Sequence, residues 1–439
     1  MEIVVVGPAD VGGGAEAVAR ALRTAWDEAG ATVRCVVGRR ATTDEGVIVL
    51  PHANHRGAVA RATLAAGGWA GRRLGLADDD VGRLAKLAEP LRVAESLAGH
   101  EDFNHPGTAH LLELLPARPD VLHLHNLHGG YFDLRALPRL SRALPTFLTL
   151  HDPWLMTGHC AHPVTCERWR TGCGSCPDLQ AYPSIRRDAT AYNWRRKEAI
   201  YRRSRLYVGA PSRWILGMVQ DSMLRHGVVE TRHIPHGVDL QTFHARTRAE
   251  ARRALSVDDA DLVVTLDVDR RKAFRSTALA WDALHEVATR HPARRMVVLA
   301  MGEDGPVAEN GRAQFRHVGR LRSPAEVARC YQAADVLLHL TRADTFPNSV
   351  MEAMACGCVV VASSVGGIPE QLQHGVHGIL VPPARTAPVV EALDALLLDP
   401  TRRDRLARAA AAHARAAFDL HATADAYLRW FEEVVEARA

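Results

Sequence analysis

Long apolar runs are missing from this sequence, and its first residues do not resemble a secretory leader. None of the apolar runs among its 439 residues approaches the roughly 18–20 residues that a membrane span needs. Residues 1–7 lack the basic region and long apolar region of a signal peptide, so we expect a first strand there and a cytoplasmic protein. Because 47% of the residues are apolar and 24% are charged, a largely disordered chain is excluded. A basic, apolar-faced stretch at 56–73 allows a peripheral membrane contact, although a solvated helix face is the simpler interpretation.

Lysine is scarce, since Lys86, Lys197 and Lys272 are the only lysines among 54 basic residues. Each of them is therefore a candidate for a specific role. The net charge of +4 is too small to indicate a nucleic-acid-binding protein, and we expect no nucleic-acid partner. Eight cysteines in so long a chain do not suggest the disulfide framework of a small secreted domain.

The length favours two domains, because a single hydrophobic core stops growing at about 250–300 residues. Short apolar runs alternate with helical patterns along the chain, which is typical of parallel α/β sheets. A Pro/Gly-rich break at 234–239 is the best candidate for a domain boundary. We expect Rossmann-like, doubly wound domains at 1–235 and 236–417, followed by a helix at 418–439. Since open parallel sheets bind ligands beyond the carboxyl ends of their strands, we expect the site in a cleft between the domains.

A glycine turn, Gly12-Gly13-Gly14, separates the first predicted strand from the first predicted helix. Glycines let the backbone approach a ligand closely, and the amides at a helix N-terminus favour an anion. The spacing is not the G-x-G-x-x-G of dinucleotide-binding proteins, which argues against a dehydrogenase. We expect Gly13 and Gly14 to contact a phosphorylated ligand; a plain tight turn is the alternative.

Two acidic residues flank a predicted strand-to-helix turn in the second half of the chain. Asp344 follows the predicted strand, and Glu352 lies eight positions later, in the first or second turn of the next helix. The amides of Asn348, Ser349 and Val350 form the N-terminus of that helix. This arrangement favours binding of a phosphate or a sugar hydroxyl.

These residues belong to a longer pattern that resembles the family-four GT-B glycosyltransferases, retaining enzymes that use nucleotide-sugar donors. The family motif E-x-F-x-x-x-x-x-E-A-x-A-x-G reads here as Asp344, Phe346, Glu352, Ala353, Ala355 and Gly357, with Asp in place of the first Glu. The G-G-x-P-E, P-N-G-V-D and R-K-G signatures of the family correspond to 366–370, 235–239 and 271–273. The resemblance covers the whole chain. It implies two Rossmann-like domains that face each other across a cleft, with a C-terminal helix that crosses back to the N-terminal domain.

The resemblance also implies roles for single residues. Asp344 holds the donor sugar, and Glu352 holds the ribose of the nucleotide. Arg271 and Lys272 neutralise the diphosphate leaving group, as fixed cations must when no metal does so; a solvated basic turn that includes Arg275 is the alternative. The predicted donor-binding residues are Gly13, Gly14, Phe346 through its following backbone, Asn348, Ser349, Val350 and Glu352.

In the first half the resemblance narrows to bacterial exopolysaccharide transferases of the colanic-acid type. The segments 119–129, 149–154 and 157–160 carry it. His151 matches the histidine that these enzymes place beside the transferred sugar, so His151, Asp344, Arg271 and Lys272 are the predicted catalytic residues. Four polar residues near the ends of two predicted strands are expected to face the acceptor: His125, Asn126, His128 and Asp152.

Four cysteines cluster in the loop 159–177, at Cys160, Cys166, Cys173 and Cys176. A C-x2-C pair with two further cysteines fits a tetrahedral zinc site. Such a zinc would be structural and not catalytic, because four thiolates leave no open coordination position. Reduced packing cysteines or a redox pair are the alternatives.

Together these features predict an enzyme that moves a sugar from a nucleoside diphosphate sugar to an acceptor hydroxyl. The expected product is a glycan, a glycolipid or a small natural product, with the anomeric configuration retained and no cofactor for catalysis. A nucleotide-sugar epimerase or a sugar phosphorylase of the same fold is the alternative. A zinc-ribbon protein that binds nucleic acid would account for the clustered cysteines and the many arginines. It would not account for the acidic residues Asp344 and Glu352 or for the two predicted α/β domains.

Overall fold

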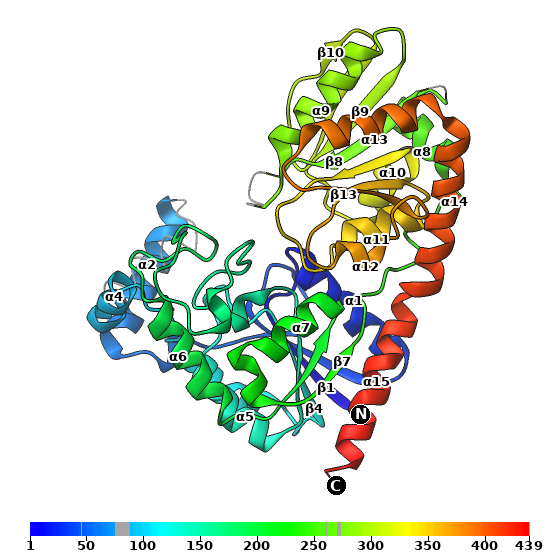
Figure 1. Cartoon of the computed structure of the whole chain (residues 1–439). Coiled ribbons are helices and arrows are strands. Elements are labelled where there is room, and N and C mark those ends of the chain that lie inside the picture. The colour runs from blue at the N-terminus through cyan, green and yellow to red at the C-terminus, as the bar shows by residue number, and fades with distance from the viewer. Residues whose placement is uncertain (45, 75–87, 260, 270–273, 439) are drawn as a thin grey trace. The chain divides into compact units, whose positions relative to one another are not determined.

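The computed structural model describes residues 1–44, 46–74, 88–259, 261–269 and 274–438, which form two compact units. Unit 1 comprises 1–210, 215–234 and 426–439, and unit 2 comprises 211–214 and 235–425. Each unit contains a seven-stranded sheet flanked by helices (Figure 1). Within the described residues, no helix has both the length and the apolar character that crossing a membrane requires.

The sheet of unit 1 is entirely parallel, with the order β3-β2-β1-β4-β5-β6-β7. Its strands are β1 (Glu2–Ala9), β2 (Thr32–Arg39), β3 (Val47–Val49), β4 (Val121–His125), β5 (Thr146–Thr149), β6 (Leu206–Ala210) and β7 (Val228–His233). The helices are α1 (Gly14–Glu28), α2 (Ala58–Leu74), α4 (Pro90–Leu97), α5 (Leu137–Ala143), α6 (Thr190–Tyr201), most of α7 (Arg213–Asp221) and the later part of α15 (Leu420–Glu436). The central strands β4, β5 and β6 are buried along their whole length, as expected for a sheet covered on both faces.

The last helix completes the core of unit 1. Its aromatic residues Tyr427, Trp430 and Phe431 are all buried. Phe431 and Trp430 pack against Phe147 of β5, with ring centroids 4.5 and 4.9 Å apart. Tyr427 also shares a hydrogen bond of 2.7 Å with the hydroxyl of Thr149.

The C-terminal segment 418–439, predicted as a helix that crosses back to the N-terminal domain, divides between the two units. Residues 418–425 belong to unit 2. The reason is local backbone pairing, because the amide of Val238 donates to the carbonyl of Phe418 and the amide of Leu420 donates to the carbonyl of Val238. The short segment 211–214 also belongs to unit 2, although its neighbours on both sides belong to unit 1.

The sheet of unit 2 has the order β10-β11-β9-β8-β12-β13-β14, parallel except for the antiparallel edge pair β10–β11. Its strands are β8 (Leu262–Asp267), β9 (Met296–Met301), β10 (Ala308–Asn310), β11 (Ala313–Gly319), β12 (Val336–His339), β13 (Val359–Ser363) and β14 (Gly378–Val381). Its helices are α8 (Arg248–Ala254), α9 (Thr277–Arg290), α10 (Pro324–Ala333), α11 (Asn348–Ala355), α12 (Ile368–Gln371), α13 (Thr386–Leu398) and α14 (Pro400–Ala417). Side chains alternate between the two faces of a strand, so β8 contributes to two separate apolar cores. Leu262 and Val264 belong to the first core, and Val263 belongs to the second. The predicted α/β fold of two Rossmann-like parallel sheets is therefore confirmed.

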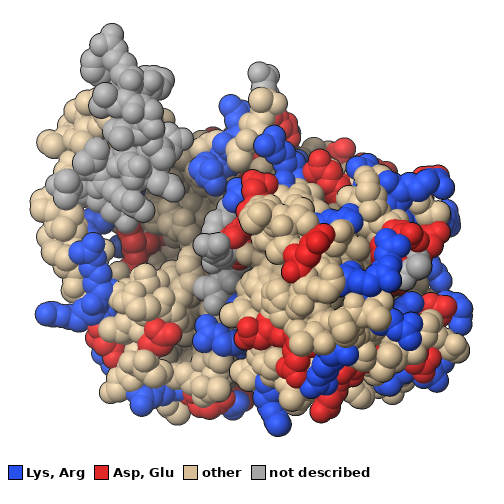
Figure 2. Space-filling view, turned by 90° about the horizontal axis from the view of Figure 1, so that it is seen from above, with Lys and Arg blue, Asp and Glu red and all other residues tan. Residues whose placement is uncertain are grey.

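Acidic and basic side chains are interspersed over the face of the molecule in Figure 2. This distribution agrees with the small net charge of +4.

His123 of β4 should make the stability of unit 1 depend on pH. Its ring is fully buried, and burial, together with the charge of His151, lowers its pKa to about 3. In the unfolded chain the pKa is about 6.5, so as the pH falls below that value the unfolded state binds a proton that the folded state does not. His123 therefore lowers the free energy of unfolding by about 1.4 kcal/mol for each pH unit between roughly 6.5 and 3.

The variant His123→Gln isolates this contribution, because its side chain does not titrate. We expect its free energy of unfolding, measured by urea denaturation, to fall less steeply with decreasing pH than that of the wild type, by the slope of one proton. Parallel profiles for the two proteins between pH 6.5 and 4.5 would contradict the assignment.

Candidate active site

The predicted acid Asp344 lies at the carboxyl edge of the sheet in unit 2. Strand β12 ends at His339, a loop follows, and α11 begins at Asn348. The Oδ2 atom of Asp344 lies 3.4 Å from Nε2 of His339 and 3.8 Å from Nη1 of Arg275. The hydroxyl of Ser349, on the first turn of α11, lies 3.0 Å from Nδ1 of the same imidazole.

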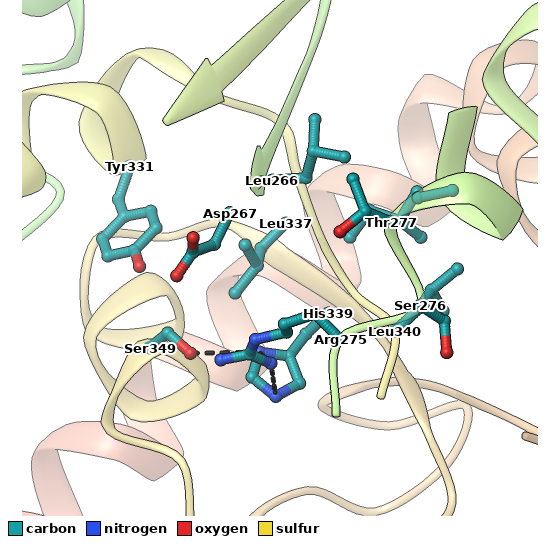
Figure 3. A pocket seen from close by; sticks show the side chains of 12 residues that line it. Leu266, Asp267, Arg275, Ser276, Thr277, Tyr331, Leu337, His339, Leu340 and Ser349 are labelled. Carbon is teal, nitrogen blue, oxygen red and sulfur yellow. Dashed lines mark hydrogen bonds between the residues drawn. The ribbon is translucent and has the colours of Figure 1, made fainter. Parts of the chain in front are cut away.

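His339 and Arg275 lie side by side at the centre of this group, as Figure 3 shows. The imidazole is buried, and the guanidinium is partly exposed. Nη1 of Arg275 lies 2.9 Å from Nδ1 of His339. Burial, and then the charge of Arg275, lower the pKa of His339 to about 4, so the imidazole is neutral at pH 7. A neutral imidazole has one N–H and one acceptor nitrogen. The two ring nitrogens therefore share the contacts with Asp344, Ser349 and Arg275, one nitrogen as donor and the other as acceptor.

Backbone pairing brings Arg275 to this position. The amide of Ser276 donates to the carbonyl of Leu340, and the amide of Arg342 donates to the carbonyl of Phe274. Arg275 itself pairs with Thr341 in an isolated bridge. The segment that precedes α9 is thus held along the loop that carries Asp344, and sequence reasoning placed neither Arg275 nor His339 in the site.

A glycine pair fixes the other side of the Asp344 loop. A Cβ atom at Gly366 would lie 1.8 Å from the carbonyl oxygen of Asp344, and one at Gly367 would lie 2.0 Å from that of Thr345. Gly366 also has a φ of +55°, in the left-handed region. Only glycine therefore allows the two loops to pack this closely.

The remaining predicted donor residues of unit 2 lie around the same loop. Asn348, Ser349 and Val350 are the first residues of α11, as predicted. Phe346 is buried against Phe418, with ring centroids 5.8 Å apart, so only its backbone is available to a ligand. Glu352 lies half-buried in the second turn of α11.

A pocket beside this loop is lined by charged and hydroxyl-bearing side chains, among them Asp267, Arg275, Tyr331, His339 and Ser349 (Figure 3). Burial raises the pKa of the Tyr331 hydroxyl well above its usual range, and the carboxylate of Glu352 adds to the shift. The predicted cations Arg271 and Lys272 lie outside the described residues, so their diphosphate role stays a prediction. Arg275 supplies a positive charge within the described part of the loop.

In unit 1 the predicted histidines lie at the carboxyl ends of two neighbouring strands. His125 ends β4, and His151 follows β5 by two residues. Nδ1 of His125 and Nε2 of His151 are 2.9 Å apart. Asn126 follows β4 directly and has a φ of +41°, a left-handed conformation that asparagine tolerates.

His128 and Asp152 form an ion pair at the same edge, and their side chains are 10% and 14% exposed. Nε2 of His128 lies 2.7 Å from Oδ2 of Asp152. Burial alone would lower the pKa of His128, but the carboxylate raises it above its usual range. Burial alone would raise the pKa of Asp152, but the imidazolium lowers it to about 2. Both shifts favour the charged forms of the pair.

The glycine turn of unit 1 faces an acidic side chain. Gly13 caps α1, and Gly14 is its first residue. The Oε2 atom of Glu16 lies 3.2 Å from the Cβ position of Gly12 and 3.3 Å from that of Gly13. A carboxylate in the first turn already complements the positive end of the helix. This arrangement disfavours a second anion there, so the diphosphate contact predicted for Gly13 and Gly14 is not confirmed.

The cysteine loop does not present a formed metal site. Cys160, Cys166, Cys173 and Cys176 all line one cavity, and His159 Nε2 lies 3.4 Å from the Sγ atom of Cys176. Nevertheless, the described part of the chain contains no group of three or more His, Cys, Asp or Glu side chains arranged to hold a metal ion. Burial raises the pKa of Cys160 to about 12 and that of Cys173 to about 11, so these thiols are protonated without a metal. Structural zinc stays a prediction from the spacing.

Comparison with solved structures identifies the fold as GT-B. The chain aligns over 99% of its length with 99% of sucrose-phosphate synthase from Thermosynechococcus elongatus, with a TM-score of 0.64 and 18% identity. It aligns over its whole length with all of Anabaena HepE, solved with UDP-glucose, with a TM-score of 0.62 and 16% identity. At these identities the likeness shows the fold alone.

Sequence comparison then points to one family of enzymes with this fold. Residues 263–399, within unit 2, match the family described as Glycosyl transferases group 1. The D-inositol 3-phosphate glycosyltransferases of Actinosynnema mirum and Saccharomonospora viridis are each 34% identical to the chain, over 198 and 220 residues. These alignments cover 42% and 47% of this chain and 47% and 51% of the relatives. The chain thus spans about half the length of the curated relatives that it matches.

Replacing Gly366 should test how tightly the Asp344 loop is held. Gly366→Ala adds both a clash with the carbonyl of Asp344 and left-handed strain, for an expected loss of about 2–5 kcal/mol in the free energy of unfolding. Gly375→Ala is the matched control, because Gly375 has a φ of +75° but nothing within 4 Å of its Cβ position. It should lose only the strain of about 1–2 kcal/mol. Equal losses in denaturant unfolding would show that the loops can separate freely.

Metal analysis decides the prediction for the cysteine loop. If zinc is a structural ligand, protein purified without added metal should contain about one zinc per chain. The double variant Cys173→Ser/Cys176→Ser should lose that zinc, whereas Cys330→Ser, at a buried cysteine outside the loop, should keep it. Wild-type protein free of zinc, with four titratable thiols in the loop, would leave packing cysteines as the explanation.

Proposed function

We propose that the protein is a glycosyltransferase that moves a sugar from a nucleoside diphosphate sugar to an acceptor hydroxyl and retains the anomeric configuration. The observation that carries this proposal is the Asp344 carboxylate, held by His339 and Arg275 beside the N-terminus of α11. The match of 263–399 to the group 1 glycosyltransferases supports it. The comparisons give no support to the alternative of an epimerase or a phosphorylase.

The chemistry requires a leaving group that can depart with its charge neutralised. The bond between C1 of the sugar and the diphosphate oxygen breaks, and C1 forms a bond to the acceptor oxygen. The proton of the acceptor hydroxyl passes to the departing phosphate. Arg275 and the amides at the start of α11 present positive charge to that phosphate, together with Arg271 and Lys272, and such fixed groups stabilise charge as it develops.

The carboxylate of Asp344 binds hydroxyl groups of the donor sugar in this proposal, and Glu352 binds the ribose. The contacts with His339 at 3.4 Å and Arg275 at 3.8 Å hold the orientation of the Asp344 carboxylate. In unit 1, His151 with its partner His125 contacts the transferred sugar, and His128 and Asp152 contact the acceptor.

The donor class is proposed from the solved neighbours as well as from the site. HepE is solved with UDP, with UDP-glucose, and with UDP and glucose. We propose UDP sugars as the first donors to test. Three further proposals rest on the sequence alone. They are membership of the exopolysaccharide subset, a cytoplasmic location and a peripheral membrane contact.

The variant Asp344→Asn tests the proposed function. It removes the charge but keeps the shape, and we expect kcat/KM for sugar transfer to fall at least 100-fold, the effect of losing one preorganised polar group, about 2.7 kcal/mol. Asp404→Asn is the matched control, because Asp404 is exposed on α14. Transfer is followed by chromatography, and the anomeric configuration of the product by NMR. If wild-type protein binds no nucleotide sugar by calorimetry, or if both variants are equally active, the proposal fails.

A further inference from the structure

A surface cavity of about 410 Å³ lies in unit 2 and shares no lining residue with the pocket beside the Asp344 loop. Its lining comes from the segment 240–246, from Ala355 at the end of α11 and from Arg415 of α14. Helix α11 begins beyond the carboxyl end of β12 and leads to the start of β13, which runs parallel to β12. Ala355 therefore lies toward the amino ends of these strands, at the opposite edge of the sheet from Asp344.

The segment 240–246 is held in shape by its own backbone and by Asp239. The carboxylate of Asp239 accepts hydrogen bonds from the amides of Gln241 and Thr242, at 2.8 and 3.3 Å, and from the hydroxyl of Thr242. The amide of Phe243 donates to the carbonyl of Asp239. These bonds order the segment without a ligand, and they engage the carboxylate that directly precedes it in the sequence.

Two arginines bring positive charge to the cavity. Among the residues that the structure describes, the guanidinium groups of Arg246 and Arg415 form no ion pair and no hydrogen bond, and both residues are exposed. None of the described lining residues is acidic. Guanidinium groups bind phosphate oxygens through pairs of parallel N–H bonds. The cavity therefore offers two cations to an incoming anion, and its described lining holds no negative charge to repel that anion.

The other side chains that line the cavity are largely apolar: Leu240, Phe243, Ala245 and Ala355, with Gln241 and His244 as the polar ones. Phe243 and Ala355 are buried members of one apolar core of unit 2. Small-molecule sites typically enclose about 300–1,000 Å³ and combine an apolar lining with a few polar groups. Inorganic phosphate would leave the apolar part of this lining in water. A ligand that carries an apolar group as well as an anionic group therefore fits the cavity better.

We propose that Phe243, Arg246 and Arg415 form a binding site for an organic phosphate whose remaining part is apolar. A phosphate monoester carries a charge of about −1.5 to −2 at pH 7, whereas a carboxylate carries a single negative charge, so the phosphate is the better match for two guanidinium groups. The two arginines bind the phosphate oxygens, and the apolar side chains contact the rest of the ligand. This inference goes beyond the proposed function, because the proposed sugar transfer uses none of these residues.

Phenyl phosphate is the probe for this site, and inorganic phosphate, phenol and benzoate serve as comparisons. Binding to the wild-type protein is measured by calorimetry at constant ionic strength. We expect phenyl phosphate to bind about 10-fold more tightly than each of the other three compounds, because only phenyl phosphate offers both a phosphate and an aromatic ring. No binding of phenyl phosphate, or binding no tighter than that of inorganic phosphate or phenol, overturns the proposal. Benzoate binding that matches or exceeds that of phenyl phosphate overturns the phosphate assignment.

The double variant Arg246→Gln/Arg415→Gln, the cavity variant, assigns this binding to the cavity. It should weaken the binding of phenyl phosphate by about 10-fold, since it removes both cations. Arg253→Gln/Arg408→Gln is the matched control, because Arg253 of α8 and Arg408 of α14 are exposed arginines outside the lining. The control loses the same net charge and should bind phenyl phosphate like the wild type. If the folded cavity variant binds as tightly as the control, the phosphate lies elsewhere and the proposal is wrong.

Donor binding distinguishes this inference from the proposed function. UDP-glucose binding, measured by calorimetry on the same samples, should be equal in the cavity variant and the wild type. If the cavity variant loses UDP-glucose binding, the cavity is part of the donor site, which overturns the proposal of a separate site. If the wild type binds phenyl phosphate through Arg246 and Arg415 but binds no nucleotide sugar, the cavity proposal stands and the transferase proposal fails.

Discussion

Parallel strand pairing is the constraint on which the candidate site depends. All seven strands of unit 1 run parallel, and so do six of the seven in unit 2, so the loops that follow them emerge along one edge of each sheet. In unit 2 this edge collects Arg275 from the loop after β8, Asp344 from the loop after β12 and Gly366 from the loop after β13. In unit 1 it collects Glu16, His128 and Asp152 in the same way. Residues far apart in the sequence are thus brought to one edge of the sheet, where Arg275 reaches Asp344 and His128 reaches Asp152.

Within unit 2, burial of one imidazole organises the charges. A protonated His339 would repel Arg275, and an apolar residue there would leave Ser349 and Asp344 without their shared contact. Burial holds the imidazole neutral, which lets it contact a cation, a hydroxyl and an anion at once. The Asp344 carboxylate, shorter than the glutamate of the family motif, gains its fixed position from this contact and from the close approach of Gly366.

Sequence reasoning predicted the elements better than the contacts between them. The alternation of apolar runs and helical patterns indicated two parallel α/β units, and the start of α11 at Asn348 followed from the acid pair. Arg275 and His339 were missed because 64 positions separate them and only strand pairing joins them. One signal for His339 was present, since it is a titratable residue that ends an otherwise apolar strand. No sequence pattern indicated that Glu16 turns back over the glycine turn.

Lys197 shows how a composition signal can point to a structural role. It was singled out because lysine is rare here, and its ammonium group is fully buried between Glu101 and the carbonyls of Trp154 and Thr157. These bonds fix the loop that carries Trp154 and leads into the cysteines. Buried charges of this kind cost much to break and specify one arrangement of the backbone.

The position of α15 has a consequence for biosynthesis. Tyr427, Trp430 and Phe431 complete the core of unit 1, yet the ribosome makes them only after the whole of unit 2. Until these residues are synthesised, Phe147 and Trp26 of the nascent first half lack their contacts with Phe431 and are exposed to solvent. Exposed apolar surface of this kind promotes chaperone binding and misassembly. Unit 1 can therefore complete its core only after the residues of α15 have been synthesised.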